Sequence, residues 1–259
     1  MKFVTLASTL LLAGTAIAAP GTARRAERHR QRAAGIRKGN PMRLSEGPAA
    51  QSANISEVSY SSNWAGAVLI GSGYTSVTGT FTVPTPSTAG SGSAWVGIDG
   101  DTCSTAILQT GIDWTKSGSS ITYDAWYEWY PDYAYDFSGI SLAAGNTIKV
   151  TVTASSKTSG TATIQNVSTG KTVTHTFSGQ TSGSLCETNA EWIVEDFEEN
   201  GGQVQFADFG TVTFTGASAT KSGSSVGVSG ATIIDMEQGS QVLVTCNTSG
   251  SSGVTCTYD

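Results

Sequence analysis

Apolar and polar residues alternate along much of the second half of the chain. A period of two residues is typical of strands that bury one face and expose the other. No segment shows the 3.6-residue apolar spacing of an amphipathic helix. The alternation predicts strands separated by turns rich in Gly, Asn and Ser, at 147–155, 161–167, 171–177, 210–216 and 241–246. Short strands at a spacing of about ten residues are typical of an all-β protein, and we expect an antiparallel β-sandwich that forms a single mature domain.

The chain begins with the pattern of a secretory signal peptide. Lys2 provides a positive charge, an apolar run extends from Val4 to Ala16, and Ala16-Ile17-Ala18 has the small residues of a cleavage site. The run is too short for a stable membrane anchor, and no later stretch has the length to cross a bilayer. We therefore expect residues 1–18 to be removed and the product to be secreted as an extracellular protein.

Charge divides the remainder of the chain into a basic and an acidic part. Nine of the fourteen Lys and Arg residues lie within the first 43 positions, whereas from residue 58 onward five Lys face seventeen acids, so the sum is 5 − 17 = −12. Residues 19–58 show no hydrophobic period, which is typical of a pro-segment or a disordered arm. A basic arm can bind nucleic acid or an anionic membrane, but behind a signal peptide a pro-segment lying on the acidic domain, 59–259, is favoured. We expect protonation of the carboxylates to weaken this pairing and free the domain.

Four cysteines, all in the acidic part, predict two disulfide bonds in a secreted protein. Cys246 and Cys256 flank NTSGSSGVT, a sequence typical of a hairpin turn, so we expect them to pair. Cys103 and Cys186 would then form a long-range bridge. The acidic part also holds acceptor sequences for N-glycosylation, Asn166-Val-Ser168 and Asn247-Thr-Ser249.

Most residue types that catalyse hydrolysis are absent or committed elsewhere. His175 is the only histidine beyond the pro-segment, which excludes a zinc site built from histidines and argues against a Ser–His pair. The G-x-S-x-G match at 223–227 lacks the strand-to-helix context of a nucleophile, and Asp99-Gly100-Asp101-Thr102 lacks the further ligands of a calcium loop. Bridged cysteines leave no thiol. Carboxylates, amides and hydroxyls remain, and we expect neither a metal nor a cofactor.

Aromatic residues and acids gather in three stretches, 93–114, 123–133 and 189–199. Alternate residues of a strand share a face. In the second stretch this parity places four residues together: Asp124, Trp126, Glu128 and Tyr130. An aromatic face that carries carboxylates is typical of a site that binds a polymer.

In the third stretch, parity predicts a core face with Trp192 and Val194. The opposite face carries Glu191, Ile193 and Glu195. Glu198 and Glu199 precede a turn and are expected in solvent. Parity alone does not rank Glu195 above Glu191 or Glu128 as a catalytic acid.

Four long segments resemble the fungal glutamic peptidases, or eqolisins. They are SNWAGAVL (62–69), AWVGIDGDTCSTAILQTG (94–111), YDAWYEWYPD (123–132) and SLCETNAEWIVEDFEE (184–199). The segments follow the order of that family, and the resemblance extends over residues 59–259. It implies a sandwich of the concanavalin-like or jelly-roll-like kind. A signal peptide followed by a basic pro-segment is also similar to the precursors of that family.

The resemblance implies a catalytic dyad of a glutamine and a glutamate. The glutamine of the family lies in ILQTG, which is Gln109 here, and its glutamate is the second acid of AEWIVED, which is Glu195. Further binding or supporting positions are implied at Trp64, Trp95, Asp101, Asp124, Trp126, Glu128 and Tyr130. The stretch after DFEE, ENGGQVQFADFG, departs from some relatives because it lacks the cysteines of an extra bridge. This departure affects the loop and leaves the dyad intact.

The function implied by the resemblance is that of a secreted acid endopeptidase with broad protein substrates. Glu195 would act as general base and acid, while Gln109 would orient the water and stabilise the oxyanion. We further expect a monomer that is inhibited by its own basic pro-segment. The residues alone leave two alternatives open: a β-sandwich glycoside hydrolase that uses two carboxylates, such as Glu128 and Glu195, and a lectin-like module without catalysis.

Overall fold

The computed structural model describes residues 37–48 and 58–259. These residues lie in one compact unit of the chain, Gly35–Asp259. The expected signal peptide, 1–18, and most of the expected pro-segment, 19–58, lie outside the described residues. The described part is built from β-strands, and it contains no helix long and apolar enough to cross a membrane. The prediction of an all-β fold is confirmed.

The described residues form nineteen strands. Those near the N-terminus are β1 (Arg37–Lys38), β2 (Val58–Ser61), β3 (Trp64–Ile70), β4 (Tyr74–Thr82), β5 (Gly90–Ile98), β6 (Ile107–Ser117), β7 (Ser120–Tyr130) and β8 (Tyr135–Asp136). Those that follow are β9 (Thr147–Ser156), β10 (Ser159–Asn166), β11 (Lys171–Phe177), β12 (Asn189–Glu195), β13 (Glu198–Glu199), β14 (Gly202–Gln203), β15 (Thr211–Lys221), β16 (Ser224–Val226), β17 (Thr232–Gln238), β18 (Gln241–Ser249) and β19 (Gly253–Tyr258). The five strands predicted from alternation correspond to β9, β10, β11, β15 and β18. Their many Thr and Val residues suit a pleated, half-buried surface.

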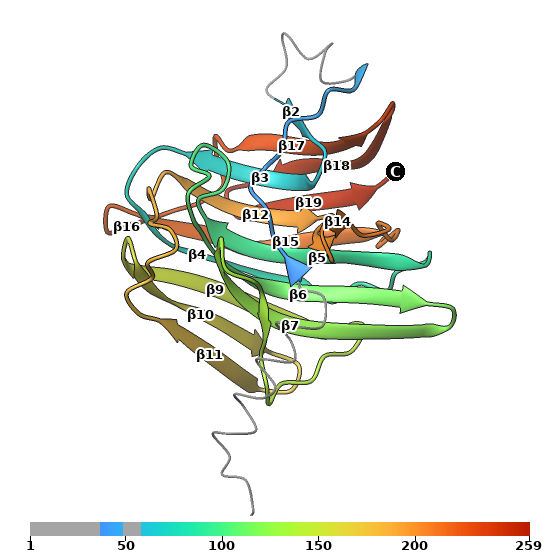
Figure 1. The fold of residues 1–259 in the computed structure, drawn as a ribbon, viewed down its shortest axis with the longest axis horizontal. Coiled ribbons are helices and arrows are strands. Elements are labelled where there is room, and N and C mark those ends of the chain that lie inside the picture. Colours follow the sequence, from blue (N-terminus) through green and yellow to red (C-terminus); the bar gives the residue numbers. More distant parts are fainter. Residues whose placement is uncertain (1–36, 49–57) are drawn as a thin grey trace, which may run out of the picture. The chain divides into compact units, whose positions relative to one another are not determined.

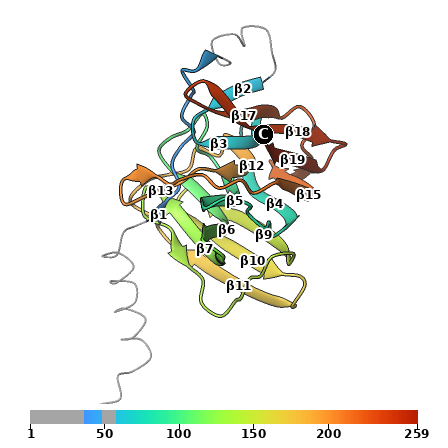
Figure 2. The ribbon, with the colours of Figure 1, turned by 90° about the vertical axis from the view of Figure 1, so that its right-hand side faces the viewer.

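Fourteen of the strands pair in the order β11-β10-β9-β4-β15-β19-β18-β17-β3-β12-β5-β6-β7-β8. Figures 1 and 2 label those from β11 to β7. β15 belongs to two layers: Thr211–Phe214 pairs with β19, and from Thr215 onward the strand pairs with β4, with a register shift between Thr215 and Ser218. One layer therefore runs from β11 to β15, and the other runs from β15 to β8. Trp192 of β12 donates a hydrogen bond to the backbone oxygen of Thr78 of β4, 2.8 Å away, which joins the layers. The β-sandwich is confirmed.

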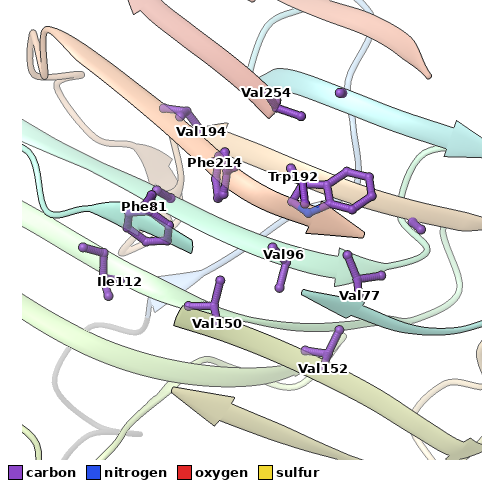
Figure 3. Packing of buried hydrophobic residues seen from close by; sticks show 14 of the residues in the cluster. Val77, Phe81, Val96, Ile112, Val150, Val152, Trp192, Val194, Phe214 and Val254 are labelled. Carbon is purple, nitrogen blue, oxygen red and sulfur yellow. The ribbon is translucent and has the colours of Figure 1, made fainter. Parts of the chain in front are cut away.

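The main hydrophobic core lies between the two layers. Val77 and Phe81 of β4 and Val150 of β9 face Val96 of β5 and Trp192 of β12 (Figure 3). Burying an aliphatic or aromatic side chain of this size contributes about 1.5–3 kcal/mol. The prediction that the 189–199 stretch sends its Trp and Val into the core is confirmed, because both belong to this cluster.

The opposite side of strands β3, β12, β5, β6 and β7, which we call the outer face, has a second cluster of buried apolar residues. Its members are Trp64, Val68, Trp95, Ile107, Trp126, Ile193 and Ile234. Met42, which belongs to the expected pro-segment, packs against this cluster. The outer face is therefore covered by the chain's own residues.

Two disulfide bonds are present, Cys103–Cys186 and Cys246–Cys256, and both expected pairings are confirmed. Beside the first bridge, the Asp99 carboxylate accepts hydrogen bonds from the backbone N–H groups of four consecutive residues, 186–189, at 2.7–3.2 Å. The loop after β5 is thereby tied to the loop that precedes β12.

Candidate active site

Three polar side chains project from neighbouring strands onto the outer face. Gln109 lies on β6, Glu128 lies opposite it on β7, and Glu195 is the last residue of β12. Each of the three is fully buried. Alternation places them on this face, because their strand neighbours point into the core. Buried polar groups of this kind are costly unless they are paired or functional.

Two consecutive residues, Gly39 and Asn40, bring the three side chains together. The Gly39 N–H donates to Glu128 Oε2 at 3.0 Å, and the Asn40 N–H donates to Glu195 Oε1 at 3.1 Å. A Cβ atom at position 39 would lie 2.6 Å from Gln109 Nε2 and 3.0 Å from Glu128 Oε2. A side chain at position 39 would therefore require the Gln109 amide to move, whereas glycine does not.

Glu195 is held by hydrogen bonds to both carboxylate oxygens. Trp95 Nε1 donates to Oε2 at 2.9 Å, and Asn40 N donates to Oε1. Burial raises the pKa of Glu195 to about 7, although the hydrogen bonds from Asn40 and Trp95 and the charge of Arg37 oppose the rise. A carboxyl group with a pKa in this range can both accept and return a proton.

Glu128 has a pKa raised well above the ordinary value, mainly by burial. The Arg37 charge and the Gly39 hydrogen bond oppose this rise, while the nearby Glu195 charge adds to it. Two buried carboxyl groups that interact in this way do not ionise independently. Glu128 can therefore remain protonated while Glu195 carries the charge.

Gln109 has a side-chain amide that is fully buried, and neither its Nε2 nor its Oε1 has a hydrogen-bond partner among the described residues. An amide that can donate and accept without restriction in a buried site is rare in a purely structural role. It can orient a water molecule through its oxygen and donate to an oxyanion through its nitrogen.

Glu191 shares the outer face with Glu195 but is placed differently. It is fully buried, and neither carboxylate oxygen has a hydrogen-bond partner in the described part of the chain. Burial, followed by the charges of Asp99 and Asp101, raises its pKa well above the ordinary value. The structure thus separates the two glutamates that strand parity could not rank, because only Glu195 contacts Asn40.

The described residues 37–48 lie over the outer face, and we call them the covering segment. Arg37 anchors this segment at one end of the outer face. Its guanidinium forms an ion pair with Asp113 and donates to Ser93 Oγ at 3.1 Å. It also lies 3.9 Å from the centroid of the Trp126 ring and 4.6 Å from that of Phe197. Burial raises the pKa of Asp113, and the Arg37 charge opposes the rise. A paired cation stacked on an aromatic ring is a strong anchor when it is desolvated.

The remaining expected site residues differ in whether they contact the segment. The Trp64 and Trp95 rings contact each other edge to face at 4.9 Å, and Lys38 lies 4.8 Å from the Tyr130 ring centroid. Asp101 is half-buried, and the oxygen of the preceding Gly100 accepts a hydrogen bond from Met42 N. Asp124 is exposed and has no direct contact with the segment among the described interactions; it affects the pKa of Asp113 only through its charge.

Several residues that contact the segment were not expected as site residues from the sequence, among them Asp113, Phe197 and Asn63. A signal for Asp113 was available, because residues 109, 111 and 113 share one face of β6. The other two lie at or beyond strand ends, where alternation gives no prediction.

Only one group of described residues has the spacing of metal ligands, Asp99 with Cys103 and Cys186. Both sulfur atoms are bonded to each other, and the Asp99 oxygens accept backbone hydrogen bonds. A bridged sulfur is not a thiolate ligand, so this group does not fit a metal ion.

Comparisons with known proteins show the family of the chain. Residues 62–258 match the Peptidase A4 family. Over its whole length the chain is 54% identical to aspergillopepsin-2 of Aspergillus niger and 47% identical to scytalidopepsin B of Scytalidium lignicola, each over 100% of the relative. A crystal structure of scytalido-glutamic peptidase with a transition state analog inhibitor has a TM-score of 0.71 at 50% identity, covering 76% of this chain and 98% of that one. The crystal structure of aspergilloglutamic peptidase from Aspergillus niger has a TM-score of 0.63 at 61% identity, covering 65% and 99%. The chain therefore belongs to the Peptidase A4 family, the eqolisins, and is a glutamic endopeptidase.

Proposed function

We propose that this peptidase is secreted, acts on proteins at acid pH and uses Gln109 and Glu195 as its catalytic dyad. The observation that carries the proposal is the approach of both side chains, from β6 and β12, to the same stretch of peptide backbone at Gly39 and Asn40. A relative solved with the tripeptide Ala-Ile-His supports peptides as the ligands of this face.

The proposed reaction needs a base, an acid and an oxyanion stabiliser. The Glu195 carboxylate removes a proton from a water molecule, whose oxygen attacks the carbonyl carbon of the substrate. The carbonyl electrons move to its oxygen, where the Gln109 N–H stabilises the negative charge. Glu195 then returns the proton to the amide nitrogen, and the C–N bond breaks. Asn40 N lies 3.1 Å from Glu195 Oε1 and donates to it, so a peptide nitrogen comes within reach of the carboxyl group that would return the proton.

We also propose that residues 19–58 form an inhibitory pro-segment of the domain 59–259. Its described part occupies the position in which a substrate would meet the dyad, and its Arg37 is held by a buried ion pair. No described carbonyl group accepts a hydrogen bond from the Gln109 amide. The segment therefore blocks the dyad without presenting a bond for attack.

Substitution of the dyad tests the catalytic part of the proposal. Glu195→Gln and Gln109→Ala should each abolish cleavage of a denatured protein at acid pH while the fold, measured by circular dichroism, is retained. Loss of a single oxyanion donor typically lowers the rate by about 10²–10³-fold. Glu191→Gln is the matched control, because it makes the same change on the same face of β12, and it should remain active. Near-full activity of either dyad variant would refute the assignment.

A synthetic peptide of residues 37–48 tests the inhibitory part. It should inhibit the enzyme more strongly near neutral pH than at acid pH, since Arg43 pairs with the carboxylate of Glu198. The pair of Arg37 with Asp113 adds to this difference as the pH rises toward the raised pKa of Asp113, which is about 8. A peptide with glutamine at both arginine positions should lose most of this pH dependence. Equal inhibition by the unmodified peptide at both pH values would contradict an electrostatic pairing.

A further inference from the structure

Asn63, in the turn between β2 and β3, contacts the covering segment only through the backbone of that segment. Its Nδ2 donates to the oxygen of Pro41 at 3.2 Å, and its Oδ1 accepts from the N–H of Arg43 at 2.9 Å. The side chain is almost fully buried, with 1% exposed. Both hydrogen-bonding ends of one amide are thus used on alternate residues of one peptide.

The orientation of this amide is fixed by its neighbours. Ser61 Oγ donates to Asn63 Oδ1 at 3.0 Å, which identifies that atom as the acceptor. Ser61 Oγ also accepts from the N–H groups of Asn63 and Trp64. The Asn63 amide, which we call the clamp because it holds Pro41 and Arg43, is therefore oriented by Ser61 and does not require the segment to set the direction of its donor and acceptor.

The segment is extended where Asn63 holds it. In an extended chain, the carbonyl of one residue and the N–H of the second residue after it point to the same side. Pro41 and Arg43 show this relation to Asn63, while the intervening Met42 sends its N–H to the oxygen of Gly100 at 3.0 Å. Ser62 N adds a hydrogen bond to the oxygen of Arg43 at 2.8 Å.

We propose that Asn63 is a substrate-binding residue that holds the backbone of protein substrates on the C-terminal side of the cleaved bond. The inference rests on the proposed dyad, because the N–H of Asn40 lies on Glu195 and Asn63 contacts the residues that follow. If the substrate nitrogen that Glu195 protonates takes the place of Asn40 N, Asn63 binds the carbonyl of the second residue after the cut and the N–H of the fourth.

This contact favours long, extended substrates of any sequence. Asn63 recognises main-chain groups only, so it adds affinity without selecting side chains. Each hydrogen bond made in a buried site contributes a modest net amount, and two together correspond to about tenfold or more in binding. A peptide that ends directly after the cut gains nothing from the clamp.

The test compares two synthetic substrates that share all residues before the cut. One ends, as an amide, one residue after the cut, and the other extends five residues beyond it. Asn63→Ala should raise KM for the long substrate about tenfold or more with kcat nearly unchanged. The short substrate should change by less than about twofold. Asn247→Ala, which removes an exposed asparagine, is the control and should leave both substrates unaffected.

Asn63→Asp provides a rescue. A protonated carboxyl group has one donor and one acceptor, as the amide has, whereas a carboxylate has no donor. Asn63→Asp should therefore approach the wild-type KM for the long substrate at low pH and lose that advantage as the introduced acid ionises. A purely structural role of Asn63 would produce neither the dependence on substrate length nor this pH-dependent recovery.

Binding measured without turnover separates this inference from the proposed function. Titration calorimetry with enzyme freed of its own segment would compare the peptides 37–48 and 37–40, the second of which ends before Pro41, the first residue that Asn63 contacts. Wild type should prefer the longer peptide, and Asn63→Ala should lose about tenfold of that preference. The rest of the preference remains, because contacts such as Met42 N with Gly100 O and Arg43 with Glu198 do not involve Asn63. An equal preference in both proteins overturns the inference, even where the dyad variants are inactive as proposed. Inactivity of wild type toward every substrate would refute the proposed function, while the calorimetric result would still decide the role of Asn63.

Discussion

The hydrogen bond from Trp95 to Glu195 makes a quantitative prediction about the pH dependence of catalysis. Trp95 Nε1 lies 2.9 Å from Glu195 Oε2 in a fully buried environment. A hydrogen bond to a charged group contributes about 1.5–3 kcal/mol, and one pKa unit corresponds to about 1.4 kcal/mol. The N–H stabilises the ionised carboxylate, so its removal in Trp95→Phe should raise the pKa of Glu195 by about 1–2 units.

A raised pKa of Glu195 should change the pH dependence of kcat/KM, because Glu195 is the proposed base. The base works only when ionised, so the acid limb of the kcat/KM profile should move up by the same 1–2 pH units, approximately, in Trp95→Phe. At a pH below the limb, activity should fall about 10–100-fold, and it should recover toward the wild-type value at higher pH. The assay is hydrolysis of an internally quenched peptide between about pH 2 and 9, a range that includes both the ordinary glutamate pKa and the pKa of about 7 that Glu195 has with residues 37–48 in place.

Trp114→Phe is the matched control. Trp114 is also fully buried, but it points into the core between the layers, and its indole nitrogen has no hydrogen-bond partner among the described residues. This variant makes the same chemical change and should leave the acid limb where it is. An unmoved or lowered limb in Trp95→Phe, or an equal shift in both variants, would refute the reasoning. A uniform loss at every pH would show that Trp95 acts through packing rather than through the N–H.

Two further predictions concern stability and modification. The pKa of Glu191 is raised in the folded protein, so the folded protein keeps a proton that the unfolded chain releases above about pH 4.3. The free energy of unfolding that this group contributes is therefore fully present at acid pH. It falls by about 1.4 kcal/mol per pH unit as the pH rises toward the pKa of Glu191 in the folded protein. Glu191→Gln should therefore lose less melting temperature than wild type between about pH 4 and pH 7, measured by calorimetry, and an equal loss in both would contradict this. Asn166 is fully buried and its Nδ2 donates to two oxygens, whereas Asn247 is exposed, so glycopeptide mass spectrometry of protein secreted from a fungal host should find a glycan at Asn247 and none at Asn166. A glycan at Asn166 would show that the site is modified before this burial forms.

The pattern along the chain was sufficient for the strands and for the direction of their side chains. TIKVTVTAS and KTVTHTF alternate so regularly that the sheet is the only structure that buries one set of residues. Trp192 and Val194 lie in the core for the same reason, and the local pairing of Cys246 with Cys256 follows from a hairpin. These features depend on residues that are close in sequence, where geometry is fixed by the strand itself.

The order of the strands could not be obtained in this way. β12 lies between β3 and β5, although six strands, β6 to β11, separate β5 from β12 along the chain. This order brings Gln109 and Glu195 to one piece of backbone and leaves Glu191 without a partner among the described residues. Non-local pairing depends on the packing of whole layers, which no short pattern encodes.

The basic segment likewise has features that the sequence predicted and features that only the tertiary structure shows. Its composition predicted a pro-segment attracted to an acidic domain, because opposite charges attract at any distance that salt does not screen. The charges did not indicate that Gly39 would lie on the Gln109 amide or that Arg37 would enter a buried pair with Asp113. The sequence alone determined the strand faces, the local disulfide and the sign of each surface, since these follow from period, spacing and composition. Only the tertiary structure decided which buried carboxyl groups meet the peptide, because that depends on strand order and on one glycine that is small enough to approach them.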